Sequence, residues 1–166
     1  MELATYSPQD VTVLVAGILP IEGFIDGTFV AITKDVMPFR SVKSTDGKIH
    51  RVYNNDATYT ITLTLHNGAD SNKDLTRLWL ADQITQMGKF PLLIKDTNGS
   101  SLFFSTTSWI ETVPTMDFAN QATSREWVIK SAQGIINIGG NTEKSGLIED
   151  LFNSAIASLP ILEGLF

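Results

Sequence analysis

The sequence predicts a mainly β protein of the α+β class, an antiparallel β-sandwich or barrel flanked by one helix. Three observations support this prediction. Many short apolar or alternating segments are separated by turns that contain glycine. One segment near the middle of the chain carries helix start and stop signals. The stretch ATYTITLTL, residues 57–65, alternates threonine with apolar residues, which is the period of a strand with one buried face.

Composition indicates one domain whose surface is largely covered by other subunits. The chain has 166 residues, which fits a single domain. Apolar residues make up 43% of it and charged residues only 18%, below the ~25% charged fraction of typical soluble domains. A domain of this size cannot hide so much apolar surface in its own core, so we favour burial between subunits. The absence of cysteine excludes disulfides, thiolate metal sites and cysteine nucleophiles.

The charge balance argues against tight binding to nucleic acid. The net charge is −6 and the pI about 4.8, whereas phosphate binding needs clustered lysine and arginine. Such a surface still allows DNA to pass without adhering. No apolar run approaches the ~18 residues that suggest a membrane span. The N-terminus also lacks the pattern of a secretion signal, so we expect no membrane insertion.

The first half of the chain predicts two strands and then an extended hairpin. Residues 11–19 are almost continuously apolar and predict a strand buried on both faces, and residues 28–33 predict a second strand. Residues 39–43 and 49–53 form the arms of a hairpin around Asp46 and Gly47. The arms concentrate the basic side chains Arg40, Lys43, Lys48, His50 and Arg51. They predict a contact arm for an acidic partner, with a solvated edge hairpin as the alternative.

The strand at residues 57–65 has two chemically different faces. Its apolar face, which belongs to a core, consists of Tyr59, Ile61, Leu63 and Leu65. The opposite face carries the hydroxyls of Thr58, Thr60, Thr62 and Thr64. A sheet half exposed to water explains this pattern, because threonine suits strands. The sharper hypothesis is a face that lines a wet, non-adhesive space.

A helix is predicted from Ser71 to about Met87. Ser71 and Asp74 match a capping box, and Gly88 and Pro91 mark the end. Its apolar residues fall on two sides, one with Leu75, Leu78 and Trp79 and the other with Leu80, Ile84 and Met87. A helix that is apolar on two sides contacts two bodies, so we expect the second side to meet a neighbouring subunit.

Further strands are predicted at residues 92–95, 102–106, 109–112, 115–118, 126–131 and 135–138. Asn98 and Gly99 join the first two of these, and Pro114 separates the third from the fourth. The spacing of apolar residues over 147–159 predicts a last amphipathic helix that ends at Pro160. We therefore expect a β domain over residues 1–141 and a helical extension over residues 142–166.

No catalytic or cofactor motif stands out. His50 and His66 have no metal-ligand spacing, no serine sits in a nucleophile elbow, and the Gly139-Gly140-Asn141 run lacks the lysine of a phosphate loop. The carboxylates are scattered over turns and caps. The sequence thus predicts a protein that is not an enzyme, with no catalytic, cofactor-binding or metal-binding residues.

Several segments, in order, resemble one family. They are ATYSPQDVTVLVAG, GFIDGTFVAI, NNDATYTITLTL, SNKDLTRL, PLLIKDTNGSSLFFSTTSWI and FANQATSREWVIK, and they span residues 4–141. This succession resembles the tail tube proteins of contractile-tailed bacteriophages. No single motif carries the resemblance, which depends on the order and spacing of all of them.

The resemblance implies two packed antiparallel sheets with a flanking helix and an extended hairpin. It also implies that six copies close into a ring whose inner strands line a channel, and that rings stack into a tube inside a sheath. Such a virion protein, made in the host cytoplasm, would guide the genome into the host and hold the tape-measure protein. The hairpin would then fix ring stacking, the threonine strand would face the channel and the outer helix side would contact a neighbouring subunit.

Other readings remain open from sequence. The tube of a phage-like secretion or bacteriocin particle belongs to the same physical class. A monomeric β-sandwich binding module, for example for glycans, would need an exposed aromatic cluster, and Trp79, Trp109 and Trp127 lie in segments that look buried. A hydrolase comes last. The sequence does not decide whether residues 57–65, 11–19 or 126–131 face a channel.

Overall fold

The computed structural model describes residues 3–141, so the predicted C-terminal extension and its helix lie outside the described residues. A short 3-10 helix, η1 Pro8–Asp10, precedes the first strand, and α1 Ser71–Thr85 follows the sixth. The strands are β1 Val11–Val15, β2 Leu19–Pro20, β3 Val30–Lys34, β4 Phe39–Lys43, β5 Ile49–Tyr53, β6 Tyr59–His66, β7 Phe90–Asp96, β8 Leu102–Thr112, β9 Ser124–Ser131 and β10 Ile135–Asn137.

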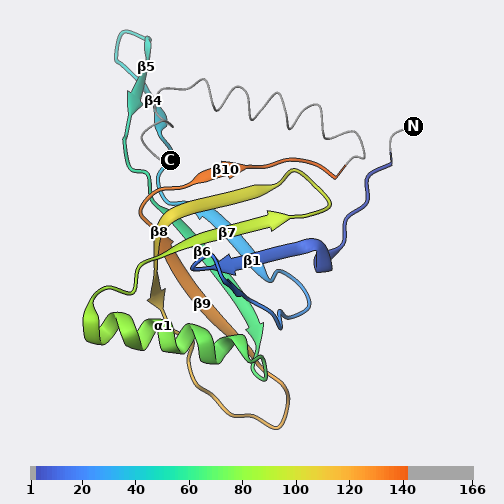
Figure 1. The fold of residues 1–166 in the computed structure, drawn as a ribbon. Helices are drawn as coiled ribbons and strands as arrows, with labels where there is room; N and C mark the ends of the chain where they lie inside the picture. Colours follow the sequence, from blue (N-terminus) through green and yellow to red (C-terminus); the bar gives the residue numbers. More distant parts are fainter. Residues whose placement is uncertain (1–2, 142–166) are drawn as a thin grey trace.

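The strands form two sheets, both antiparallel. One is eight-stranded in the order β2-β1-β7-β8-β9-β6-β3, with β10 attached to β8, and β4 and β5 form a separate two-stranded sheet. Helix α1 lies across one end of the large sheet, and the β4–β5 hairpin projects beyond the other end (Figure 1). The predicted mainly β, α+β class with a flanking helix is confirmed. Within residues 3–141 no helix is long and apolar enough to cross a membrane.

A bend in β8 turns the single large sheet into two facing layers. Residues 102–108 of β8 pair with β7, and residues 102–104 also pair with β10, whereas residues 108–112 pair with β9. A register shift between Ile110 and Thr112 marks a bulge, which bends and twists a strand. Where the pairing partner of β8 changes from β7 to β9, the buried hydroxyls of Ser108 and Ser131 form a hydrogen bond of 2.7 Å. We call β2-β1-β7-β8-β10 the first arm and β8-β9-β6-β3 the second arm.

The core lies between the two arms. On β6 the predicted apolar face is fully buried, and its side chains meet those of β1 and β7 from the first arm. Tyr59 contacts Phe103 edge-on, with ring centroids 5.2 Å apart. Leu75 brings α1 into the same core. The buried apolar residues are Val13, Val15, Ile21, Tyr59, Ile61, Leu63, Leu65, Leu75, Phe90, Leu92, Ile94, Phe103, Ile110, Trp127 and Ile129.

The capping box predicted at Ser71 and Asp74 is wrong. The helix N-cap is Asp70, and no side chain caps the first turn. Ser71 is already helical and buried, and its Oγ accepts a hydrogen bond from the distant backbone N–H of Glu22 at 2.9 Å. Asp74 instead lies 3.6 Å from the guanidinium of Arg77. The serine therefore ties the helix to the loop after β2.

Three predicted strands also need correction. The strand predicted over residues 11–19 ends at Val15, because Ala16 and Gly17 adopt positive φ angles of 57° and 74° and reverse the chain into β2. Residues 109–112 are not a separate strand but the second half of β8. Residues 115–118 form no strand, and Met116 and Phe118 are exposed there. The sequence pattern of residues 115–118 is typical of a strand, but their backbone pairs with no other strand of the described chain.

The two faces of β6 should respond differently to truncation. Leu63→Ala should lower the free energy of unfolding by about 2–5 kcal/mol, because it leaves a cavity in a closed core. Thr62→Ala, one position away on the outer face, should cost less than about 1 kcal/mol. Urea unfolding of the unassembled protein measures both values. Equal losses would contradict this assignment of the faces.

Candidate assembly surfaces

The outer face of the second arm carries a row of threonine hydroxyls. Thr60, Thr62 and Thr64 point away from the core and are half-buried. Thr58 comes before β6, and its hydroxyl donates to Asp56 Oδ1 at 2.6 Å. The residues paired with these threonines on the neighbouring strands are Ala31, Thr33, Glu126, Val128 and Lys130. This outer surface, which we call the threonine face, therefore extends over three strands.

The lysine on the threonine face is neutralised by a carboxylate. Lys130 Nζ donates to Asp35 Oδ2 at 2.6 Å and to Thr60 Oγ1 at 2.8 Å, and the Thr60 hydroxyl also donates to Asp35. The hydrogen bond from Lys130, followed by that from Thr60, lowers the pKa of the Asp35 carboxyl below its ordinary value. The cluster is thus an ion pair with no net charge at neutral pH. Lys130 offers little attraction to a passing phosphate.

The second arm has an unpaired backbone edge at each end. Within residues 3–141, β3 pairs only with β6, and residues 109–112 of β8 pair only with β9. Hydrogen bonds from Asp35 N to Thr58 O and from Thr64 N to Phe29 O turn the odd-numbered residues toward β6. The N–H groups of Val30 and Ile32 therefore point away from β6. Such edges are open to pairing with another chain.

The β4–β5 hairpin has the predicted bounds, and its side chains are exposed. Arg40, Lys43, Lys48 and Arg51 lie on it as expected. The sequence reasoning missed its exposed apolar residues, which are Phe39, Val42, Ile49, Val52 and Tyr53. The apolar residues that stand among the basic ones in both hairpin strands were the available signal. An isolated two-stranded hairpin is marginally stable in water, so a partner surface would stabilise this one.

The hairpin tip is held by its own turn. Asp46 Oδ1 accepts from the N–H of Lys48 at 3.2 Å and also from the hydroxyl of Ser44, and Gly47 provides a φ of +85°. The bond from Ser44, and then that from Lys48, lowers the pKa of the Asp46 carboxyl. These contacts fix the shape of the tip before any partner binds.

Helix α1 has the predicted second apolar side. Leu75 is buried, and Leu78 and Trp79 pack against the core. On the other side Leu80 is 43% exposed and Ile84 82% exposed. Met87, also 82% exposed, lies beyond the helix end, because Gln86 adopts a left-handed conformation. The exposed side is confirmed, whereas its contact with a neighbouring subunit stays a prediction.

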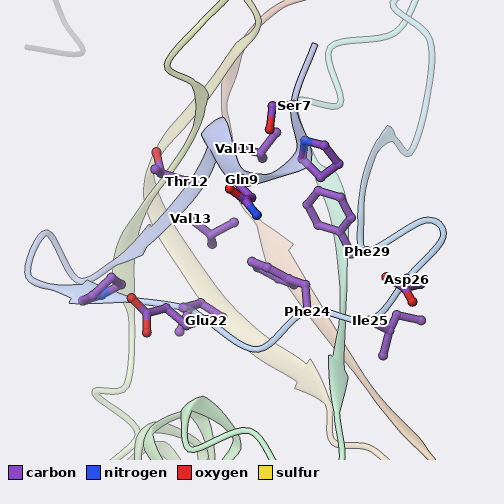
Figure 2. Close-up of a pocket in the computed structure, with 13 residues that line it drawn as sticks. Ser7, Gln9, Val11, Thr12, Val13, Glu22, Phe24, Ile25, Asp26 and Phe29 are labelled. Carbon is purple, nitrogen blue, oxygen red and sulfur yellow. The ribbon is translucent and has the colours of Figure 1, made fainter.

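A groove of about 640 Å³ opens between the η1–β1 segment and the loop of residues 20–29 (Figure 2). Phe24, Phe29 and Val13 project into it, and Glu22 and Asp26 lie toward its two sides. The Phe24 and Phe29 rings are 5.1 Å apart. We call this the phenylalanine groove.

Backbone hydrogen bonds fix both walls of the phenylalanine groove. The loop wall is bound along β6, where His66 N donates to Gly23 O at 2.7 Å and Thr64 N to Phe29 O at 2.9 Å. Gly23 has a φ of +84°, and a Cβ there would lie 2.4 Å from that of Ala69, so only glycine fits. The other wall is held by Thr97, which donates from its N–H and its hydroxyl to Asp10 O at 2.9 Å. The groove is therefore formed before any occupant arrives.

Comparison with known proteins places these surfaces in context. The chain is 32% identical over 154 residues to the structural protein ORF10 of Pseudomonas phage KPP10, and the match covers 89% of each protein. No protein-family model matches the chain.

Solved structures with the same fold come from an anti-feeding prophage, an extracellular contractile injection system and a gene transfer agent virion. The tube terminating cap of the anti-feeding prophage matches with a TM-score of 0.51 at 16% identity, over 81% of this chain and 94% of that one. The sheath/tube terminator of an extracellular contractile injection system matches at 0.53 and 17%, over 81% and 97%. A chain of a gene transfer agent virion matches at 0.55 and 12%, over 81% and 100%.

Asp35 should stabilise the fold in a pH-dependent way. Its folded pKa is lowered, so its contribution is present above the unfolded pKa of about 3.9 and is lost as the pH falls through the folded value. Asp35→Asn should therefore cost roughly 1 kcal/mol at pH 7 and progressively less below about pH 4. Thermal unfolding at several pH values measures this.

The control for this experiment is Glu126→Gln, which removes an exposed carboxylate from the same face. If both variants lost stability with the same pH profile, the contact of Asp35 with Lys130 would not be the cause.

Proposed function

The chain belongs to the family of phage structural proteins that includes ORF10 of Pseudomonas phage KPP10, and we propose that it closes into stacked hexameric rings that form the tube of a contractile tail. Two fold neighbours, a tube terminating cap and a sheath/tube terminator, support a place on the axis of such a particle. The resemblance of the sequence to the tail tube proteins of contractile-tailed bacteriophages also supports a tube role. The virion is then its location, after synthesis in the host cytoplasm.

The observation that carries the proposal is the pair of unpaired edges on the second arm. An edge on β3 and another on the second half of β8 lie at opposite ends of one four-stranded layer. Pairing β3 of one copy with β8 of the next repeats head to tail, which is the geometry that closes rings. The same pairing removes edges that otherwise invite aggregation. The second arms of all copies then form one continuous barrel.

The threonine face lines the channel of that barrel. Its hydroxyls keep the wall hydrated, and the pairing of Lys130 with Asp35 leaves no free cation at that position. With a net charge of −6, the chain as a whole repels DNA phosphate. The genome therefore slides through the channel, and the tape-measure protein occupies the same space beforehand.

The remaining exposed surfaces suit further contacts in the tail. The outer side of α1, with Leu80, Ile84 and Met87, packs against a neighbouring subunit. The outside of the ring faces the sheath protein. The β4–β5 hairpin connects successive rings, with Arg40, Lys43, Lys48 and Arg51 setting their register.

A tube terminator is a second candidate, favoured by the two terminator structures among the fold neighbours. A terminator and a tube subunit share the ring and differ in whether rings stack without limit. The tube of a phage-like secretion or bacteriocin particle has the same physics as a phage tube. The two alternatives differ only in the kind of particle that contains the chain.

Negative-stain electron microscopy of the purified protein tests the proposal directly. We expect rings or tubes with a central hole at high protein concentration. Single rings that never stack would support the terminator instead. A strictly monodisperse monomer at all concentrations would contradict ring formation and favour a monomeric binding module.

The channel assignment predicts the effect of new positive charge. Thr62→Lys combined with Thr64→Lys should leave ring formation intact but make the assemblies bind duplex DNA, with an affinity that falls steeply as salt rises. Gel-shift assays at about 50 mM and about 200 mM salt measure this change.

The matched control is Gln83→Lys, which adds a cation to the exposed surface of α1. Equal DNA binding by this control would show that the threonine face has no special access to DNA in the channel.

A further inference from the structure

We propose that the phenylalanine groove receives the β4–β5 hairpin of a second copy of this chain. The proposal rests on the self-assembly proposed above and deepens it, because it names the receiving surface and the residues on both sides. It assigns the groove between η1–β1 and residues 20–29 to protein–protein docking.

The groove has the form of a prepared docking site. Its floor is apolar, with Val13 buried and the rings of Phe24 and Phe29 half-buried (Figure 2). Both walls are held by the backbone bonds described above, so little ordering is needed on binding. Its volume of about 640 Å³ exceeds what one or two side chains fill, and it lies within the ~300–1,000 Å³ typical of binding pockets. Glu22 and Asp26 are exposed at its sides and make the rim acidic.

One face of the hairpin is complementary to that groove. Cross-strand partners share a face, so Phe39 and Tyr53 lie on the same side as the pair Lys43 and Ile49. The Phe39 and Tyr53 rings are 5.3 Å apart, and the Arg51 guanidinium lies 4.0 Å from the centre of the Phe39 ring. This face therefore presents an apolar ridge flanked by two cations, opposite an apolar floor flanked by two carboxylates.

The groove and the hairpin of one chain do not meet. The hairpin forms its own two-stranded sheet and projects beyond the end of the large sheet, away from β1 (Figure 1). Its apolar ridge is exposed, with Tyr53 at 64% and Ile49 at 74%. A hairpin from another copy supplies an apolar side that can cover the apolar floor of the groove. The contact is heterologous, because two different surfaces meet, and it can therefore propagate from copy to copy.

Charge reversal on each side tests the proposal. The groove variant Glu22→Lys/Asp26→Lys and the hairpin variant Lys43→Glu/Arg51→Glu should each raise the concentration needed for stacking by roughly tenfold or more, because like charges then face each other. Combining all four changes in one chain restores opposite charges and should return stacking to within about threefold of the original. Sedimentation velocity measures stacking, and circular dichroism checks folding.

Arg40→Glu and Lys43→Glu, each a single charge reversal, compare the two faces of the hairpin, because the pairing of Arg40 with Val52 places it on the face opposite Lys43. Arg40 is among the cations proposed to set ring register, so Arg40→Glu should weaken stacking, but less than Lys43→Glu does. An equal loss would show that the charge of the hairpin matters and not the face named here, which would overturn the docking geometry.

Cross-linking tests the same contact without charge changes. The chain has no cysteine, so Ile49→Cys on the hairpin and Gln9→Cys in the groove introduce single thiols. Mixing the two variants with a short bismaleimide should give a covalent dimer. Ile18→Cys, at a site 84% exposed outside the groove, replaces Gln9→Cys in the control and should give none.

The outcomes separate this proposal from the proposed function. Rings or tubes that are insensitive to the groove variant, with no specific cross-link, would overturn the docking proposal and leave the tube. A specific cross-link in a protein that never forms rings would support the docking contact and count against the tube.

Discussion

The fold depends on one strand that belongs to two layers. β8 pairs with β7 and β10 in its first half and with β9 in its second half. At the passage, the buried hydroxyls of Ser108 and Ser131 satisfy each other at 2.7 Å. A buried hydroxyl without a hydrogen-bond partner would cost free energy. Because the two serines bond to each other, both polar side chains can be buried at the bend of β8. Without the bend the two arms would not face each other, and β6 would have no apolar layer to pack against.

The bend also decides which surfaces remain for assembly. Because both arms turn their apolar faces inward, the outer face of the second arm is left with threonines and an ion pair. Two groups of the apolar side chains that the core does not take up lie on the hairpin and on the outer side of α1, and the others lie in loops and at the ends of strands. The sequence has a low charged fraction, 18%, and part of its apolar content lies on these exposed surfaces and not in the core. This is the distribution expected of a subunit and not of a solitary domain.

Local patterns in the sequence predicted the elements whose causes are local. The bounds of β4 and β5 follow from the Asp46-Gly47 turn, and the two faces of β6 follow from strict alternation. The errors arose where the partner is distant. Ser71 looked like a cap, but its hydroxyl binds a backbone group 49 positions away, and the serine pair in the β8 bend is 23 positions apart. The phenylalanine groove is lined by residues 7–13 and 20–29, which tertiary packing brings together. No periodic pattern in the sequence could therefore have predicted it.

The two proposed modes of contact differ in their physics, and this gives the assembly an order. Edge pairing between β3 and β8 uses backbone hydrogen bonds, which are little affected by salt. Docking of the hairpin uses exposed cations and carboxylates, whose attraction is screened over about 10 Å at 0.1 M salt. The proposed contact that closes rings is therefore less sensitive to salt than the proposed contact that stacks them. A tube built this way forms complete rings first and joins them second, so an incomplete ring has no stable place in the stack.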